Sequence, residues 1–262
     1  MNRNHQRVCT SPEWAAQLVS DVLSPLSAGV PLGPELLEIG PGPGAATEWL
    51  RSRVRSLIAV EIDPVAAQEL RARFPDTNVE VVTADATELP WPDGSFDTVA
   101  SFTMLHHVPT QHGQNAVLAE ALRVLRPGGV LLASDSRPSD SLHEFHAEDT
   151  YNPIDPAGLI ARLQTIGYGR LIVEVGDRWM VRAYKPADGE KIRLSRGRLP
   201  DPGQPTYRAG GSTEEPSQRV TRRASSTSSR CSAAGRPRLS SALWMRYCTV
   251  FLCRTSCSAV AL

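Results

Sequence analysis

The amino-acid sequence predicts an α/β protein, doubly wound around a mostly parallel sheet of seven strands whose last strand is antiparallel. Apolar runs typical of strands alternate with amphipathic runs typical of helices as far as about residue 185. The last two strand-like runs, 170–175 and 178–184, are separated only by Gly176 and Asp177. Strands joined so closely must be antiparallel, because a parallel pair needs a crossover of about a dozen residues or more. The sheet is therefore expected to end in a hairpin.

Each helix and strand is expected from its local pattern. The first helix should follow the capping residue Ser11 and Pro12, and its apolar side chains recur on one face. Pro64 opens a later helix, and Asp155 with Pro156 opens the last one. The expected helices are 11–26, 44–54, 64–74, 114–125 and 157–167. The expected strands are 35–40, 56–63, 78–85, 96–103, 130–136, 170–175 and 178–184.

The character of the chain changes near residue 187. From there on it is rich in Ser, Arg, Pro and Gly and has neither a helical nor a strand period. Such a composition cannot bury enough apolar surface to offset the entropy of ordering the chain. We therefore divide the chain into an N-terminal helical segment (1–28), a ligand-binding domain (29–186) and a low-complexity tail (187–262) that is expected to be disordered.

Composition and charge exclude several classes of function. The 262 residues carry no net charge and are 41% hydrophobic, which suits a soluble protein and gives no reason to expect a nucleic-acid partner. No signal peptide is expected, and no apolar stretch reaches the ~18 uncharged residues of a membrane span. Of five cysteines only Cys9 precedes residue 200, and none has CxxC spacing. This pattern indicates a reducing, cytoplasmic location without disulfides or a cysteine zinc site. The oligomeric state stays open.

The most informative motif is the run LLEIGPGPGAAT at 36–47. Gly40, Gly42 and Gly44 lie between an expected strand and an expected helix, where missing side chains let a ligand approach the backbone. The free N–H groups and positive dipole end of the helix favour an anionic or hydrogen-bond-accepting ligand. In form the motif also matches the dinucleotide pattern G-x-G-x-x-G/A, so a nicotinamide cofactor stays an alternative.

Three carboxylates follow the same edge of the expected sheet. Glu61 ends the second strand about 20 residues after the turn, where an acid accepts both hydroxyls of a ribose. Asp85 ends the third strand and is placed to meet an adenine edge. Glu38 lies beneath the glycine turn, where a buried carboxylate needs loop N–H groups or a ligand ammonium as its partner. Asp63, before Pro64, is expected to cap a helix.

The order of these features resembles one known family. The segments LLEIGPGPGAAT, AVEIDP, TADATELPWPDGSFDTV, LHHV and EALRVLRPGGVLLASDS are together similar to the small-molecule class I S-adenosylmethionine-dependent methyltransferases. The resemblance covers roughly residues 10–185. It implies a Rossmann-like sheet of seven strands, S-adenosyl-L-methionine as the cofactor and a small-molecule substrate. It also implies the cofactor contacts, which are Glu38, Gly40, Pro41, Gly42, Gly44, Glu61, Ile62, Asp85, Ala86, Thr103, Leu105 and His107.

The resemblance also assigns roles to these residues. The glycine turn would pass under the methionine part of the cofactor, with Glu38 anchoring the turn. Glu61 would bind the ribose hydroxyls, Ile62 would pack on adenine, and Asp85 and the Ala86 N–H would meet the adenine edge. Thr103 and Leu105, after the fourth strand, would line the methionine and sulfonium region, with His107 nearby.

Methyl transfer from a sulfonium requires the nucleophile, the methyl carbon and the sulfur in line, with water excluded. An acidic acceptor such as a phenol needs little more, whereas an alcohol or a carbon acid needs a base. His106 lies at the carboxyl ends of the strands, where ligands bind in this class of fold, and is the candidate catalytic base. The alternative is that His106 has a packing role.

The segment 137–156 joins the fifth strand to the last helix and should overlie the transferred methyl group. By resemblance this is where substrate contacts lie, and His146, Tyr151 and Asn152 are the candidates. His143 and His146 have helical spacing, but no ligand set of an established zinc pattern appears, so no metal site is expected.

Two alternatives to a methyltransferase stay open from the sequence. An NAD(P)-dependent oxidoreductase is favoured only by the formal glycine match. A non-catalytic protein that binds S-adenosylmethionine is made plausible by the unusual tail and by the lack of an unambiguous base. The acceptor, and whether O-, N- or C-methylation occurs, cannot be read from the sequence.

Overall fold

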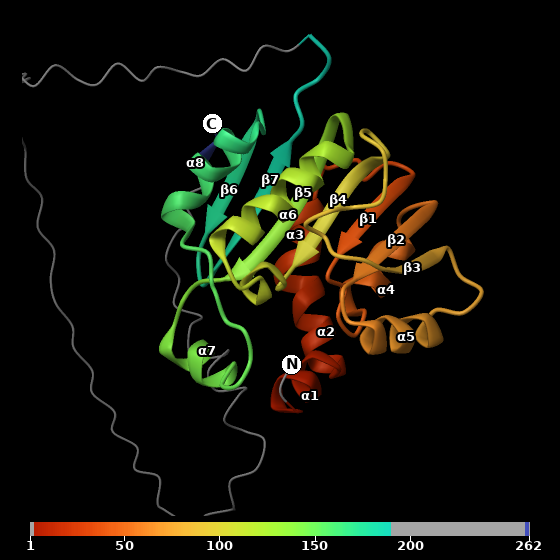
Figure 1. Ribbon diagram of the computed structural model, residues 1–262, viewed down its shortest axis with the longest axis vertical. Helices are drawn as coiled ribbons and strands as arrows, with labels where there is room; N and C mark the ends of the chain where they lie inside the picture. The colour runs from red at the N-terminus through yellow and green to blue at the C-terminus, as the bar shows by residue number, and fades with distance from the viewer. Residues whose placement is uncertain (1–2, 190–259, 262) are drawn as a thin grey trace, which may run out of the picture. The chain divides into compact units, whose positions relative to one another are not determined.

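The computed structural model describes residues 3–189 and 260–261, which form one mixed sheet with helices around it (Figure 1). The strand order is β3-β2-β1-β4-β5-β7-β6-β8. The strands are β1 (Glu35–Ile39), β2 (Ser56–Glu61), β3 (Val79–Thr83), β4 (Phe96–Phe102), β5 (Leu125–Ser136), β6 (Leu171–Val175), β7 (Arg178–Tyr184) and β8 (Val260–Ala261).

The pairing of the strands confirms the predicted topology. β3, β2, β1, β4 and β5 pair in parallel, and β7 pairs antiparallel with both β5 and β6. The hairpin expected from the short connection is therefore present. Beyond the seven predicted strands, two residues of β8 pair antiparallel with β6 at the sheet edge. The rest of the predicted tail from residue 190 onward lies outside the described residues.

The helices follow the predicted order, with three short additions, two of them after the first strand. Those after the first strand are α4 (Ala45–Arg51), α5 (Pro64–Arg73), the 3-10 turn η2 (Leu105–His107), α6 (Gln111–Val124), α7 (Asp140–Phe145) and α8 (Pro156–Ile166). The N-terminal ones are α1 (Arg3–Cys9), α2 (Pro12–Leu18), η1 (Val19–Leu23) and α3 (Ser24–Ser27). The helix α1 has no counterpart among the predicted elements.

The single helix expected over 11–26 contains a π-helical turn, η1. Pro25 has no N–H to donate to the carbonyl four residues earlier, and the N–H of Ser24 bonds to Val19, five residues earlier. The predicted caps are confirmed, because the side chains of Ser11, Asp63 and Asp155 each accept a hydrogen bond from the first turn of their helix.

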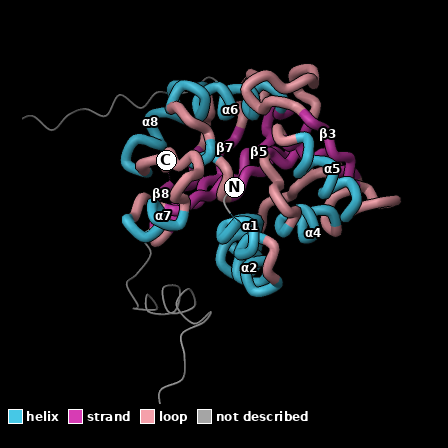
Figure 2. The backbone as a smooth tube through the Cα atoms, turned by 60° about the horizontal axis from the view of Figure 1, so that its bottom comes forward, coloured by secondary structure: helices cyan, strands magenta, loops and turns pink. Residues whose placement is uncertain are grey.

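Two hydrophobic clusters cover the two faces of the sheet. One joins the strands to α6 and α8, and the other joins them to α2, η1, α3, α4 and α5. Adjacent residues of β1 divide between them, with Leu37 in the first cluster and Leu36 in the second. Figure 2 shows this layering, with α6 and α8 on one side of the strands and α2, α4 and α5 on the other.

The N-terminal helices are tied to the sheet by a side chain from β7. Arg182 donates hydrogen bonds from Nε to the carbonyl of Leu26 (2.8 Å) and from Nη2 to that of Pro25 (2.7 Å). This anchor directs α2 and α1 toward the carboxyl ends of the parallel strands. In Figure 1, α1 and α7 lie at the end toward which β1, β4 and β5 point.

Candidate active site

A cavity of about 700 Å³ opens at the carboxyl ends of β1, β2, β3 and β4. Its floor comes from the glycine turn and the ends of these strands, and its remaining wall comes from α1, α2 and the segment before α8. The volume is within the range of small-molecule sites. The floor includes Glu38, Gly40, Pro41, Gly42, Glu61, Ile62, Asp85, Ala86, Thr103 and His107.

The three glycines of the turn have different surroundings. All have positive φ values, 66° for Gly40, 51° for Gly42 and 85° for Gly44. A Cβ on Gly42 would meet no protein atom within 4 Å, whereas one on Gly44 would lie 2.6 Å from a methyl carbon of Leu70. Gly42 therefore faces the cavity. Gly44 does not line it, contrary to expectation, because this glycine is packed against α5.

Glu38 lies beneath the turn, 2% exposed. Its Oε2 accepts a hydrogen bond of 2.7 Å from the hydroxyl of Thr47 in α4. Burial raises the pKa of Glu38 to about 7, and the Thr47 hydrogen bond opposes that rise. The expected partners were loop N–H groups or a ligand ammonium. The protein partner is instead a hydroxyl, and the carboxyl group also lines the cavity.

The two other acids also line the cavity, at neighbouring strand ends. Glu61 accepts a hydrogen bond from the N–H of Asp63 (3.1 Å), and Asp85 accepts one from the N–H of Thr87 (2.8 Å). Between them Ile62 is 65% exposed, which is unusual for a large apolar side chain. Two carboxylates with an exposed apolar side chain between them suit a ligand that has hydroxyl groups and a flat ring.

The end of β4 departs from the prediction at one residue. Thr103 has a positive φ of 51°, and its N–H donates to the carbonyl of Ser134 in β5 at 2.8 Å. This turn brings Thr103 and His107 to the cavity. Leu105 does not line it, contrary to expectation, because its side chain is 2% exposed and packs in the hydrophobic cluster under α6.

The candidate base His106 is buried and is not among the residues that line the cavity. Its Nδ1 lies 2.6 Å from Oδ1 of Asp135, and the other oxygen of that carboxylate accepts the backbone N–H of His106 at 3.0 Å. Its Nε2 lies 3.1 Å from Nε2 of His146. In this arrangement both ring nitrogens of His106 face protein groups, so it does not reach an acceptor in the cavity.

The three candidate substrate contacts do not line the cavity either. His146 is buried, and the ring of Tyr151 stacks on it with centroids 4.5 Å apart. Asn152 joins two loops, since its N–H donates to the carbonyl of His106 at 2.7 Å and its Nδ2 to that of Val108 at 3.0 Å. These side chains hold the wall of the cavity in place.

Other residues of the same region line the cavity instead. The cavity wall contains Glu148, Asp149 and Thr150 of the segment before α8, and His5, Cys9, Trp14 and Leu18 of the N-terminal helices. The apolar stripe on the first helix was a usable signal for Trp14 and Leu18. Nothing in the sequence pattern indicated His5, because the contact it makes with Asp149 joins residues 144 positions apart.

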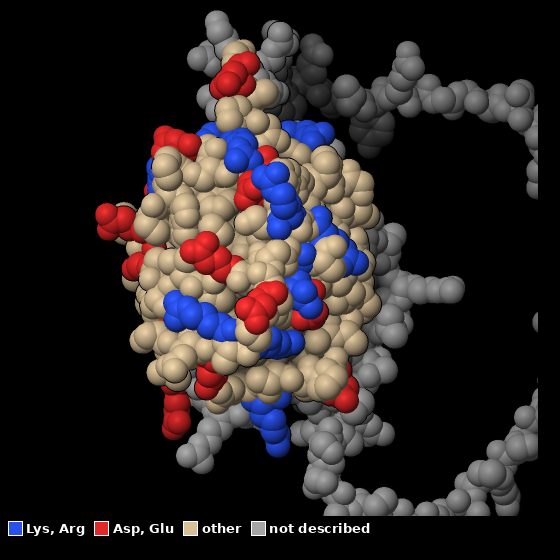
Figure 3. Space-filling model, turned by 90° about the vertical axis from the view of Figure 1, so that its right-hand side faces the viewer, with Lys and Arg blue, Asp and Glu red and all other residues tan. Residues whose placement is uncertain are grey.

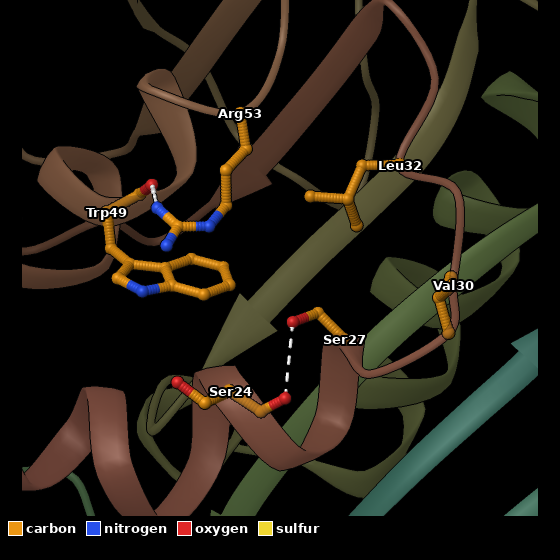
Figure 4. Close-up of a pocket in the computed structure, with 6 residues that line it drawn as sticks. All are labelled: Ser24, Ser27, Val30, Leu32, Trp49 and Arg53. Carbon is orange, nitrogen blue, oxygen red and sulfur yellow. Dashed lines mark hydrogen bonds between the residues drawn. The ribbon is translucent and has the colours of Figure 1, made fainter.

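A second hollow of about 380 Å³ lies between α3, α4 and the loop before β1. Figure 4 shows its six lining residues, with the guanidinium of Arg53 over the ring of Trp49. The distance from the guanidinium carbon to the ring centroid is 3.6 Å, and Nη1 donates to the Trp49 carbonyl at 2.7 Å. The guanidinium of Arg53 is therefore already engaged with Trp49 and is less available to a ligand. For this reason the larger cavity is the better candidate site.

The surface near the β3 edge carries charges of both signs. Figure 3 shows Lys and Arg interspersed with Asp and Glu on that face, without a continuous basic area. Within the part of the chain that the structure describes, no helix combines the length and apolarity needed to cross a membrane.

Comparison with known proteins identifies the fold and the domain. The model of the family described as methyltransferase domain matches residues 37–133. A probable S-adenosylmethionine-dependent methyltransferase of Mycolicibacterium smegmatis is 32% identical over 143 residues, which are 52% of each chain. A fatty-acid O-methyltransferase of the same species is 32% identical over 115 residues, 43% of this chain and 41% of that protein.

A solved protein of Pyrococcus horikoshii OT3 shares the fold, with a TM-score of 0.59 at 19% identity, over 71% of this chain and all of that one. The chain spans about half or less of the length of the two curated relatives. The matched segment begins in β1 and ends in β5, and it contains the glycine turn and all three acids. Residues 37–133 therefore match a methyltransferase domain, and the chain is similar to S-adenosylmethionine-dependent methyltransferases.

Proposed function

We propose that this protein transfers a methyl group from S-adenosyl-L-methionine to a small-molecule acceptor. The single observation that carries the proposal is the cavity at the strand ends, into which the turn at Gly42 and the carboxylates of Glu38, Glu61 and Asp85 converge. When bound, the cofactor supplies an electrophilic methyl group on a sulfonium.

The residues on the cavity floor suit the parts of this cofactor. The open backbone at Gly42 leaves room for the amino-acid arm, and Glu38 is a nearby acid for its ammonium group. Glu61 is the acceptor for the ribose hydroxyls, while Ile62 offers an apolar surface to the adenine ring. Asp85 and the Ala86 N–H supply an acceptor and a donor for the adenine edge.

The wall above the floor supports an acceptor that is at least partly apolar. Trp14, Leu18, Phe102, Met104 and Val108 line this part of the cavity. One relative is named a fatty-acid O-methyltransferase, so a small carboxylic acid or hydroxylated lipid is the class to test first. The walls exclude water and orient the acceptor, which is the main requirement for methyl transfer.

We further infer that the protein works in the cytoplasm, on a small molecule and without nucleic acid. The zero net charge and the mixed surface charges support this partner class. Cys9 is a free thiol, which agrees with a reducing compartment. Residues 1–28 would form part of the substrate wall, and residues 29–186 would form the cofactor-binding domain.

The test compares ligand binding by calorimetry in three proteins. The wild type should bind S-adenosylhomocysteine and should not bind NADH. Glu61→Ala should weaken the binding about 10- to 100-fold, because hydrogen bonds to a charged group are worth about 1.5–3 kcal/mol. Glu69→Ala, an exposed glutamate on α5, is the matched control and should bind like the wild type. NADH binding, or equal affinity in the wild type and Glu61→Ala, contradicts the proposal.

Turnover separates an enzyme from a non-catalytic binder. The wild type is incubated with cofactor labelled in the methyl group and with panels of fatty acids, phenols and amines. Transfer of the label to one panel is expected. Tight binding of S-adenosylhomocysteine without transfer to any panel would favour the non-catalytic alternative.

A further inference from the structure

A cluster of histidines lies between the cavity and the segment before α8. One ring nitrogen of each of His5, His107 and His146 lies within 4.8 Å of a ring nitrogen of each of the others. His5 and His146 are 5% and 4% exposed, while His107 is partly buried. The three come from α1, η2 and the end of α7, so three separate segments of the chain meet here.

The second nitrogen of each ring is held by an oxygen atom. Nδ1 of His107 lies 3.1 Å from the carbonyl of Thr150, and Nδ1 of His146 lies 2.7 Å from that of Leu142. Nδ1 of His5 lies 3.3 Å from the carboxylate of Asp149. A carbonyl oxygen only accepts, so Nδ1 of His107 and of His146 must carry the proton, which leaves the lone pair of each neutral ring on Nε2. Metal-binding histidines show this same arrangement.

The contact between His146 and His106 points independently to a cation. Nδ1 of His106 faces the carboxylate of Asp135 at 2.6 Å and therefore donates to it. In the neutral rings the lone pairs of His106 and His146 then face each other across 3.1 Å. Such a pair is repulsive unless a proton or a metal ion lies close to it.

We propose that His5, His107 and His146 form a binding site for one divalent transition-metal ion of the zinc type, with Asp149 orienting His5. Three imidazole ligands suit zinc and leave a fourth position for an oxygen ligand. Because His5 and His107 line the cavity, the open position faces the acceptor side. A further role of the bound ion, which rests on the proposed function, is to hold an acceptor hydroxyl or carboxylate oxygen beside the methyl group.

Metal binding is tested directly, without the methyltransferase assay. Full-length protein without an affinity tag is freed of metal with a chelator and titrated with ZnCl₂ by calorimetry. His5→Ala and His107→Ala should each weaken zinc binding by at least about tenfold. Asp149→Asn should weaken it less, since it removes only the group that orients His5. His112→Ala, an exposed histidine outside the cluster, is the matched control and should bind zinc like the wild type.

Cobalt identifies the ligands of the bound ion. Co²⁺ bound by histidines should give visible absorption bands of a tetrahedral site without the near-ultraviolet charge-transfer band of thiolate ligands. Circular dichroism confirms that each variant is folded, and zinc should raise the melting temperature of the wild type but not of His5→Ala. The proposal is overturned if the wild type shows no saturable zinc binding, if His5→Ala and His107→Ala bind like the wild type, if His112→Ala loses binding equally, or if the cobalt spectrum shows thiolate ligation. Methyl transfer without zinc binding would contradict only the metal proposal. Zinc binding without methyl transfer would contradict only the proposed function.

Discussion

The floor and the wall of the cavity are built in different ways. The floor consists of the glycine turn and three strand ends, each of which is recognisable from a short stretch of sequence around it. The wall consists of side chains that come from α1, α2 and the segment before α8, and two of them, Asp149 and His5, are 144 residues apart. The proposed cofactor side thus depends on local motifs, whereas the proposed acceptor side depends on contacts between distant segments.

The largest effect is expected behind the wall, at Asp135 in β5. Its buried carboxylate accepts the ring Nδ1–H of His106 and the backbone N–H groups of His106 and Ser136. Asp135→Asn should lower the free energy of unfolding by about 3–5 kcal/mol, because these three N–H donors lose a charged acceptor. Urea denaturation measures it, with Asp93→Asn as control. Asp93 is 79% exposed and pairs with Arg123, so its loss should cost at most about 1 kcal/mol. Equal effects of the two changes would argue against a wall that depends on tertiary contacts.

The next effect is expected in the floor, at Gly42. Gly42→Val would place a side chain into the cavity, and its Cβ would have no protein atom within 4 Å. We expect S-adenosylhomocysteine binding to fall more than about 100-fold, while the positive φ costs about 1–2 kcal/mol of stability. Gly44→Val should show the reverse, a larger loss of stability through its clash with Leu70. Calorimetry and urea denaturation of both variants distinguish these outcomes, and an unchanged affinity in Gly42→Val would contradict the assignment of the floor.

A smaller effect with a pH signature is expected at Glu38. Its pKa of about 7 in the folded protein lies above the ordinary value of 4.5, so the folded state retains a proton that the unfolded state has released. The stability that this group contributes is therefore complete below about pH 4.5 and is lost as the pH rises through 7. Glu38→Gln should remove this loss, which is on the order of 2–3 kcal/mol.

The measurement for Glu38 is urea denaturation of the ligand-free protein at pH 5 and pH 8. Relative to the wild type, Glu38→Gln should be more stable at pH 8 than at pH 5. A stability difference that does not change with pH would show that the carboxyl group is not protonated in the folded state.

The smallest effect is expected at the helix cap next to the floor. Asp63 accepts hydrogen bonds from the N–H groups of Val65 and Ala66 at 2.8 and 3.4 Å. Asp63→Ala should cost about 1 kcal/mol of stability through the lost cap. Affinity for S-adenosylhomocysteine should change little, in contrast with Glu61→Ala. A tenfold loss of affinity in Asp63→Ala would assign it to the cofactor site instead.

The sequence by itself determined the sheet topology, the caps and most of the cavity floor. These features are local: the periods of strands and helices, the two-residue hairpin connection and the glycine turn each involve a short stretch of chain. Their patterns can therefore be recognised in the sequence alone. For the same reason Glu38, Glu61 and Asp85 were placed at one edge before their contacts were known. Gly44 and Leu105 do not line the cavity, because Gly44 packs against α5 and Leu105 packs under α6.

Which residues form the wall of the cavity was decided only by the tertiary structure. The helix α1 has no counterpart among the predicted elements, and its place over the cavity involves contacts with distant segments, such as that of His5 with Asp149. His106 was expected near the acceptor, yet the carboxylate of Asp135 in β5 draws it into the protein interior. The histidine cluster exists because α1, η2 and the end of α7 meet in space. The spacing within any one segment does not reveal this cluster, since His5 lies more than 100 positions from the other two histidines and those two lie 39 positions apart.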